Sequence, residues 1–175
     1  ILSLYEHGTI DNITTAQGCL QANELVMNTL LEKGDEVISV VPGYQQFVDV
    51  PKSLGCKVHL VELDEMNWQL SVEKFRDILN PSTKMIILNN PSNPTGTEYS
   101  RCFLNALIEL CKPYNTYILC DEVYRGLNDE ASISDLYENG ISTSSLSKIF
   151  SLAGLRLGWI KANTYVIHQI NVRRD

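Results

Sequence analysis

Glycine, acidic and basic residues recur where short apolar runs of this sequence end. Gly18 opens an amphipathic stretch, Asp121 directly follows an apolar run, and Lys148 and Arg156 follow a weaker one. The first turn of a helix offers free N–H groups to an anion, and the planar guanidinium of an arginine donates two hydrogen bonds to a phosphate at once. A lysine with a lowered proton affinity can serve as a nucleophile or a base. These residue types could therefore bind a phosphate and carry covalent or acid–base chemistry.

Each of these positions also has an ordinary structural interpretation. A glycine before a helix is commonly a simple turn, and Asn93-Pro94-Thr95-Gly96 suits a β-turn. An aspartate such as Asp121 after a strand often caps a helix, and a single lysine such as Lys148 is typical of the solvated surface. No one of them is specific, so their combined order along the chain decides the interpretation.

Apolar runs alternate with amphipathic stretches, and this alternation predicts the elements that position the polar residues. We expect strands at residues 13–15, 36–41, 57–63, 84–88, 116–120, 141–144 and 157–160. We expect helices at residues 19–33 (ended by Gly34), 44–54 (ended by Gly55), 71–79 (capped by Ser71), 100–111 (capped by Ser100) and from 163 onward. The dense β-branched run at 36–41 indicates a strand that is buried on both faces.

This order of elements predicts an α/β fold, a three-layer sandwich with a mostly parallel central sheet and helices on both faces. In such sheets, ligands bind beyond the carboxyl ends of the strands. The polar residues that follow the strands are therefore expected to meet in one site. No G-x-G-x-x-G pattern follows any strand, which argues against a dinucleotide-binding domain.

Composition limits the partners and the compartment. The chain has 175 residues, enough for one domain, and a net charge of −7, which argues against a nucleic-acid or anionic membrane surface. No apolar run reaches the roughly 18 residues of a membrane span. The five cysteines are odd in number and form no C-x-x-C pair. They indicate buried or half-buried free thiols of a reducing cytosol rather than disulfides or a metal site.

Four motifs in a fixed order carry a specific resemblance. They are N-P-x-N-P-T-G at residues 90–96, D-E-x-Y at 121–124, S-x-S-K at 145–148 and, eight residues later, Arg156, followed by Gly158-Trp159. The chain from about Asp11 to Trp159 resembles the aminotransferases of class I/II, which are pyridoxal 5'-phosphate (PLP) enzymes of fold type I. The resemblance implies their large domain and PLP as the cofactor.

The resemblance also implies roles for individual residues. Lys148 would hold the cofactor as a Schiff base and then act as the proton-transfer base. Asp121 would pair with the pyridine nitrogen and keep it protonated, while Asn93 and Tyr124 would hydrogen-bond the 3-oxygen. Tyr44 would stack on the ring. The catalytic set is thus Lys148, Asp121 and Tyr124.

The phosphate of the cofactor would bind at the first turn of the first long helix. The resemblance places it on Gly18 and on the backbone N–H groups of Cys19 and Leu20, with side-chain contacts from Ser145 and Arg156. Family members commonly carry small or polar residues where this chain has Cys19 and Leu20, but backbone donation does not depend on the side chain.

The family pattern further predicts the domain organisation. Residues 1–162 would be the PLP-binding large domain without its N-terminal segment, and residues 163–175 would begin the helix that leads to an absent small domain. In the family, that small domain supplies the arginine for the substrate carboxylate, and Arg173 and Arg174 are too close to Lys148 in sequence for this role. The full-length protein would be a cytoplasmic homodimer.

Three functions remain open at this point. The expected reaction is amino-group transfer between an amino acid and a 2-oxo acid. A PLP-dependent C–S β-lyase resembles the same motifs. The aminotransferase-like, PLP-sensing half of a transcription regulator does too, although no DNA-binding segment is visible. The motifs do not identify which amino acid would be the substrate.

Overall fold

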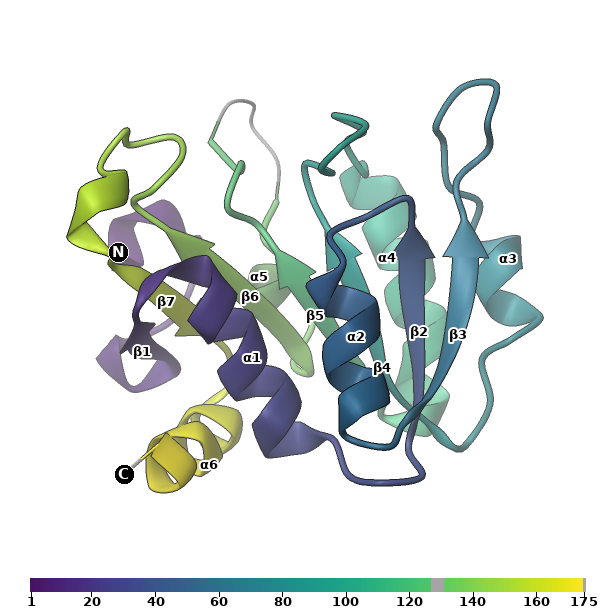
Figure 1. Cartoon of the computed structure of the whole chain (residues 1–175), viewed down its shortest axis with the longest axis horizontal. Coiled ribbons are helices and arrows are strands. Elements are labelled where there is room, and N and C mark those ends of the chain that lie inside the picture. Colours follow the sequence, from purple (N-terminus) through teal and green to yellow (C-terminus); the bar gives the residue numbers. More distant parts are fainter. Residues whose placement is uncertain (127–130, 175) are drawn as a thin grey trace.

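A seven-stranded sheet forms the centre of the computed structural model, which describes residues 1–126 and 131–174 (Figure 1). The strands lie in the order β1-β7-β6-β5-β4-β2-β3. Every neighbouring pair is parallel except the two that β7 makes with β1 and β6. The predicted mostly parallel sheet is therefore confirmed. The bounds are β1 Ile13–Ala16, β2 Glu36–Val41, β3 Lys57–Glu62, β4 Thr83–Asn89, β5 Tyr117–Asp121, β6 Gly140–Ser145 and β7 Gly158–Lys161.

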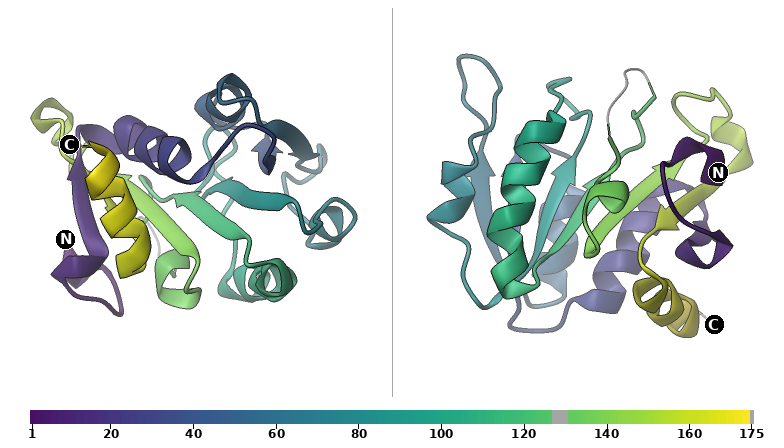
Figure 2. Two further views of the ribbon diagram at one scale, coloured as in Figure 1. Left: turned by 90° about the horizontal axis from the view of Figure 1, so that it is seen from below. Right: turned by 180° about the vertical axis from the view of Figure 1, so that it is seen from behind.

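Helices cover both faces of the sheet, as the alternation of elements predicted. Figure 2 shows α1 and α2 on one side and α4 and α5 on the other. The helices are α1 Gly18–Leu30, α2 Gln46–Ser53, α3 Glu73–Arg76, α4 Arg101–Cys111, α5 Ile133–Leu136 and α6 Thr164–Arg174. Four short 3-10 turns are η1 Leu2–Leu4, η2 Ile10–Asn12, η3 Lys112–Tyr114 and η4 Ala153–Leu155.

The central strands are buried on both faces because successive side chains enter two different apolar clusters. In β4, Met85 and Ile87 join a cluster with residues of α1, α2 and α6, whereas Ile86 and Leu88 join one with residues of α3, α4 and α5. In β2, Val37 likewise joins the first cluster, and Ile38 and Val40 join the second. This double burial is what the continuous apolar runs of the sequence predicted.

Two helix boundaries differ from the prediction. Helix α1 ends at Leu30 because the backbone of Leu31 is extended, and Gly34, with φ of +98°, belongs to the turn beyond it. The helix predicted at 71–79 shrinks to α3, in which Phe75 is the buried residue, and a single apolar anchor supports little helix. Ser71 is not its N-cap, although the Ser71 hydroxyl accepts a hydrogen bond from the Glu73 N–H at 3.2 Å.

The other capping and cysteine predictions are mostly confirmed. Ser100 caps α4 by accepting a hydrogen bond from the Phe103 N–H at 3.2 Å. All five cysteines are free, but Cys102 is exposed rather than buried, since it lies on the solvent side of α4. Within the described residues, no helix has the combined length and apolar character needed to cross a bilayer.

A polar cluster connects the amino-terminal ends of three strands, at the edge of the sheet opposite the carboxyl ends of the parallel strands. The Glu36 carboxylate of β2 lies 3.1 Å from Lys57 Nζ and 2.8 Å from His59 Nε2 of β3. It also accepts a hydrogen bond from Asn80 Nδ2 at 2.9 Å, just before β4. These donors, led by Asn80, lower the pKa of Glu36 from its ordinary value of 4.5 to about 2.

This cluster predicts a defined acid sensitivity. Because the pKa of Glu36 is lower in the folded chain, its stabilising effect is present above about pH 4.5 and is lost as the pH falls toward 2. We expect Glu36→Gln to flatten the loss of stability between pH 5 and 2 in urea unfolding experiments. Glu109→Gln, at an exposed pair with Lys112, is the control and should keep the wild-type profile. Identical profiles for wild type and Glu36→Gln would contradict the assignment.

Candidate active site

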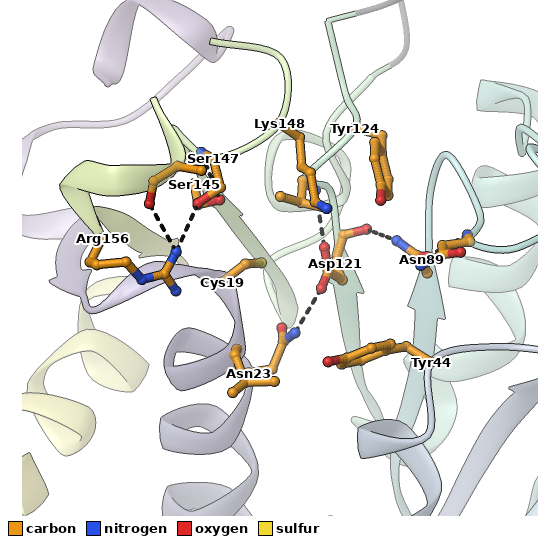
Figure 3. A pocket seen from close by; sticks show the side chains of 14 residues that line it. Cys19, Asn23, Tyr44, Asn89, Asp121, Tyr124, Ser145, Ser147, Lys148 and Arg156 are labelled. Carbon is orange, nitrogen blue, oxygen red and sulfur yellow. Dashed lines mark hydrogen bonds between the residues drawn. The ribbon is translucent and has the colours of Figure 1, made fainter. Parts of the chain in front are cut away.

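A pocket of about 320 Å³ opens at the carboxyl edge of the parallel strands (Figure 3). All of the predicted site residues except Gly18 line it, and Gly18 lies directly beneath Arg156. The lining residues are Cys19, Leu20, Asn23, Tyr44, Asn89, Asn93, Asp121, Val123, Tyr124, Ser145, Ser147, Lys148, Ala153 and Arg156. The structure thus brings together residues that are spread over most of the sequence.

Sheet topology explains why these residues meet. Tyr44 follows β2, Asn93 follows β4, Asp121 ends β5 and Lys148 follows β6, and the carboxyl ends of these parallel strands lie at one edge. Strand β7 runs the opposite way, so its amino-terminal end lies at this edge and brings Arg156 to the pocket. Because β1 is parallel to β6, helix α1 also begins here.

The first turn of α1 and the Arg156 side chain form a cationic end of the pocket. Helix α1 begins at Gly18, and the N–H groups of a first helical turn lack partners within the helix. The Arg156 guanidinium donates to the Ser147 hydroxyl at 3.3 Å and to the Ala153 carbonyl at 3.2 Å. Arg156 itself has φ of +50°, a left-handed conformation that costs a non-glycine residue about 1–2 kcal/mol. Such an end suits an anion.

Two glycines permit this arrangement. A Cβ on Gly18 would lie 2.5 Å from an Arg156 guanidinium nitrogen, so any side chain there would displace the arginine. A Cβ on Gly158 would lie 2.4 Å from the Gly18 carbonyl carbon and 2.6 Å from its oxygen. The start of β7 therefore passes against the backbone of α1 with no room for a methyl group.

Asp121 forms the floor of the pocket and is 6% exposed. One carboxylate oxygen accepts a hydrogen bond from Asn23 Nδ2 at 2.7 Å, and the other accepts from the Val123 N–H at 3.0 Å. Burial raises the pKa of Asp121, while Asn23, Val123, Cys19 and the charge of Lys148 oppose the rise. Within the described residues this carboxylate has no ion-pair partner.

Lys148 and Tyr124 face each other across the mouth of the pocket. Lys148 Nζ lies 5.7 Å from the centre of the Tyr124 ring, and the lysine side chain is exposed. Asn93 is held by its backbone, whose N–H donates to the Asn89 side-chain oxygen at 2.6 Å. The Asn89 amide in turn donates to the main-chain oxygen of Asp121 at 2.8 Å. These contacts join the loops after β4 and β5.

The remaining predicted residues lie around the rim. Tyr44 is 45% exposed and contacts Phe47 edge-on, with ring centres 6.0 Å apart. Leu20 is 51% exposed and turns its side chain toward solvent. Burial raises the pKa of the Cys19 thiol well above its ordinary value, so this thiol stays neutral at physiological pH.

Sequence reasoning missed three polar lining residues, Asn23, Asn89 and Ser147. Asn89 lies one residue before the recognised motif and directly after an apolar run, so its position at a strand end was a usable signal. Asn23 is a polar residue within the apolar face of α1, next to Ala22 and near Val26 and Met27. A buried polar side chain needs a partner, and that expectation could have singled it out.

Nearly the whole chain matches one known protein family. Residues 3–175 match the family described as aminotransferase class I and II. The chain belongs to this family. Its members use PLP as their cofactor. The predicted fold is confirmed as well, because solved aminotransferases share it.

Curated relatives and solved structures of the family agree. The chain is 32% identical over 153 residues to a probable aspartate aminotransferase of Methanocaldococcus jannaschii, covering 86% of this chain and 40% of that protein. It is 34% identical over 157 residues to an aspartate aminotransferase of Thermotoga maritima, covering 86% and 42%. The crystal structure of a PLP-dependent aminotransferase from Streptococcus suis superposes with a TM-score of 0.96 at 43% identity, covering 99% of this chain and 47% of that one. The chain thus spans less than half the length of these relatives.

The close backbone contact at the cationic end of the pocket predicts a sharp difference between two glycines. Gly158→Ala must push β7 away from α1, and overpacking of this kind costs about 1–3 kcal/mol in the free energy of unfolding. Gly154→Ala is the matched control, because a Cβ there meets nothing within 4 Å. Denaturant unfolding of both variants measures the difference. Equal stability of the two variants would contradict the packing argument.

Proposed function

We propose that the protein is a PLP-dependent aminotransferase that transfers an amino group between an amino acid and a 2-oxo acid. In this proposal residues 1–162 are the PLP-binding large domain, and residues 163–175 lead toward a small domain. The observation that carries the proposal is the pocket itself, which places a buried carboxylate, an exposed lysine and an arginine at a helix start around about 320 Å³.

The donor set of the pocket fits PLP at both ends. Asp121 is a buried carboxylate without an ion-pair partner in the described part of the chain, so a ligand that presents a protonated nitrogen would meet a ready counter-charge. At the other end, the first turn of α1 and the Arg156 guanidinium suit a dianionic phosphate. One molecule with a pyridine ring and a phosphate satisfies both ends.

The phosphate contacts are proposed in detail as follows. Gly18 and the backbone N–H groups of Cys19 and Leu20 face the anion, and Ser145 and Arg156 add side-chain donors. Ser145 is buried at the end of β6, and its hydroxyl already accepts a hydrogen bond from the Ser147 N–H at 3.2 Å. Its hydroxyl hydrogen is therefore available to a phosphate oxygen.

When bound, PLP supplies an electron sink for the electrons that are left when a bond to the substrate α-carbon breaks. Lys148 would hold the cofactor covalently through Nζ, and its amine, once released, would take and return the α-proton. Asp121 would keep the ring nitrogen protonated. Asn93 and Tyr124 would donate hydrogen bonds to the 3-oxygen, and Tyr44 would cover one ring face and fix its tilt.

The relatives favour amino-group transfer over C–S bond cleavage, because they are named as aminotransferases of aspartate and of glutamate and pyruvate. A screen that reads 2-oxo acid exchange against release of pyruvate and ammonia separates the two reactions. Release of ammonia with pyruvate from cysteine-type substrates, without exchange, would replace the transferase by a lyase.

We further propose a cytoplasmic homodimer as the working form. Five free cysteines support a reducing compartment, and the net charge of −7 speaks against a nucleic-acid partner. Exposed apolar side chains near the mouth of the pocket support a partner subunit there. They are Leu20, Tyr44, Phe150, Leu152 and Leu155. Sedimentation of the full-length protein tests the dimer.

The covalent anchor gives the first functional prediction. Borohydride treatment of the PLP-loaded protein, followed by peptide mass mapping, should place a pyridoxyl group on Lys148, and Lys148→Ala should carry none. Lys161 is the informative alternative, since it is buried and paired with Asp135 at 2.6 Å. A pyridoxyl group on Lys161 or on any other lysine would remove Lys148 from the mechanism.

The proposed separation of cofactor binding and substrate binding between two domains gives the second functional prediction. In this proposal, the arginine for the substrate carboxylate belongs to the small domain. We therefore expect the 175-residue chain to bind PLP but to exchange amino groups at least about 100-fold more slowly than a full-length family member, because misplacement of reacting atoms is costly. PLP absorbance and exchange with a panel of amino acids are measured together. Turnover equal to that of the full-length control would show that the substrate site lies within these residues.

A further inference from the structure

Three buried side chains from three elements form a hydrogen-bonded chain behind the pocket floor, of which Figure 3 shows the link between Asn23 and Asp121. The Thr143 hydroxyl of β6 donates to Asn23 Oδ1 of α1 at 2.5 Å, and Asn23 Nδ2 donates to the Asp121 carboxylate of β5 at 2.7 Å. Asn23 is 1% exposed and Thr143 is fully buried. Thr143 and Asp121 lie 120 and 98 positions from Asn23 in sequence, so the fold alone creates these contacts.

Two neighbours agree on which way the Asn23 amide faces. The Asp121 carboxylate can only accept, so it faces the amide nitrogen, and the Thr143 hydroxyl donates its hydrogen to the amide oxygen. The second amide hydrogen has a weaker partner in Gln46 Oε1 at 3.4 Å. A flipped amide would direct its oxygen at a carboxylate oxygen and leave both without a hydrogen. Thr143 therefore supports the orientation in which Asn23 donates to Asp121.

The donor has an electrostatic consequence for Asp121. Burial favours the neutral carboxyl, and a hydrogen bond to the charged form opposes this. Asn23 is the foremost of the groups that lower the pKa of Asp121, ahead of the Val123 N–H, the Cys19 thiol and the Lys148 charge. Because Val123 holds the other oxygen, the two donors also fix the plane of the carboxylate.

We propose that Asn23 is a positioning residue for the reaction: oriented by Thr143, it holds the Asp121 carboxylate ionised and aimed at the ring nitrogen of the cofactor. The inference rests on the proposed function, since it concerns the same site. It assigns a specific role to the polar residue that interrupts the buried apolar face of α1.

Two measurements test the proposal on the intact chain. The first uses the protein without cofactor and follows the Asp121 carboxyl by carbon NMR of a ¹³C-aspartate-labelled sample as a function of pH. Asn23→Leu should titrate Asp121 at a higher pH than wild type, and Thr143→Val should give a smaller shift in the same direction. Asn105→Ala, an exposed asparagine on α4, should give none.

The second measurement uses ¹⁵N-labelled PLP and follows the chemical shift of its ring nitrogen at neutral pH, which reports how far this nitrogen is protonated. We expect Asn23→Leu to move the shift toward that of the neutral ring, because a carboxylate without its donor competes more strongly for the proton between the two groups. Asp121→Asn, which removes the carboxylate, should move it further. Thermal unfolding of each variant is recorded in parallel, and Asn23→Ser serves as a second variant if Asn23→Leu does not fold.

The outcomes separate the inference from the function on which it rests. If Asp121→Asn moves the ring-nitrogen shift and the Asn23 variants, though folded, leave both that shift and the Asp121 titration at wild-type values, Asn23 has only a structural role and the inference is overturned. If Asp121→Asn also leaves the ring nitrogen unchanged, the placement of the cofactor is wrong. Changes in both measurements, graded from Thr143→Val to Asn23→Leu, support the positioning role.

Discussion

The contact between two backbones at Gly18 and Gly158 is the constraint on which the site depends. It lets β7 enter the sheet directly beside the first turn of α1, and no side chain fits between them. Arg156 lies two residues before Gly158, so its side chain lies beside the free N–H groups at the start of α1. A looser contact would separate the guanidinium from the helix start, and the pocket would lose the paired donors that suit a phosphate.

The opposite end of the pocket faces a different physical demand. A carboxylate with 6% exposure is costly to ionise. Around Asp121, the described part of the chain provides amide N–H donors and the distant ammonium of Lys148, but no cation in direct contact. Such a site suits a ligand with a cationic atom. The two ends of the pocket thus differ in charge, and a ligand with a cationic ring and an anionic arm would match both.

The sequence predicted most of this architecture because its signals are local. Strands with continuous apolar runs, such as β4, and helices with clear caps, such as α4, were placed to within about two residues. The short α3 was overestimated since its amphipathic pattern does not reveal that Phe75 alone is fully buried there. The link between Asn23 and Asp121 could not be read from the chain, because it depends on the packing of α1 across β5 and β6.

The reversal of β7 has a consequence for how a ligand would be held. Lys148 and Arg156 lie on one connection between antiparallel neighbours, which is closed by hydrogen bonds from the Leu146 N–H to the Leu157 carbonyl at 2.9 Å and from the Leu152 N–H to the Leu146 carbonyl at 3.0 Å. In the proposed function, the residue that would hold the cofactor covalently and the residue that would bind its phosphate therefore belong to a single loop. A cofactor bound through both residues would gain from a high effective concentration, because either contact would keep the other within reach.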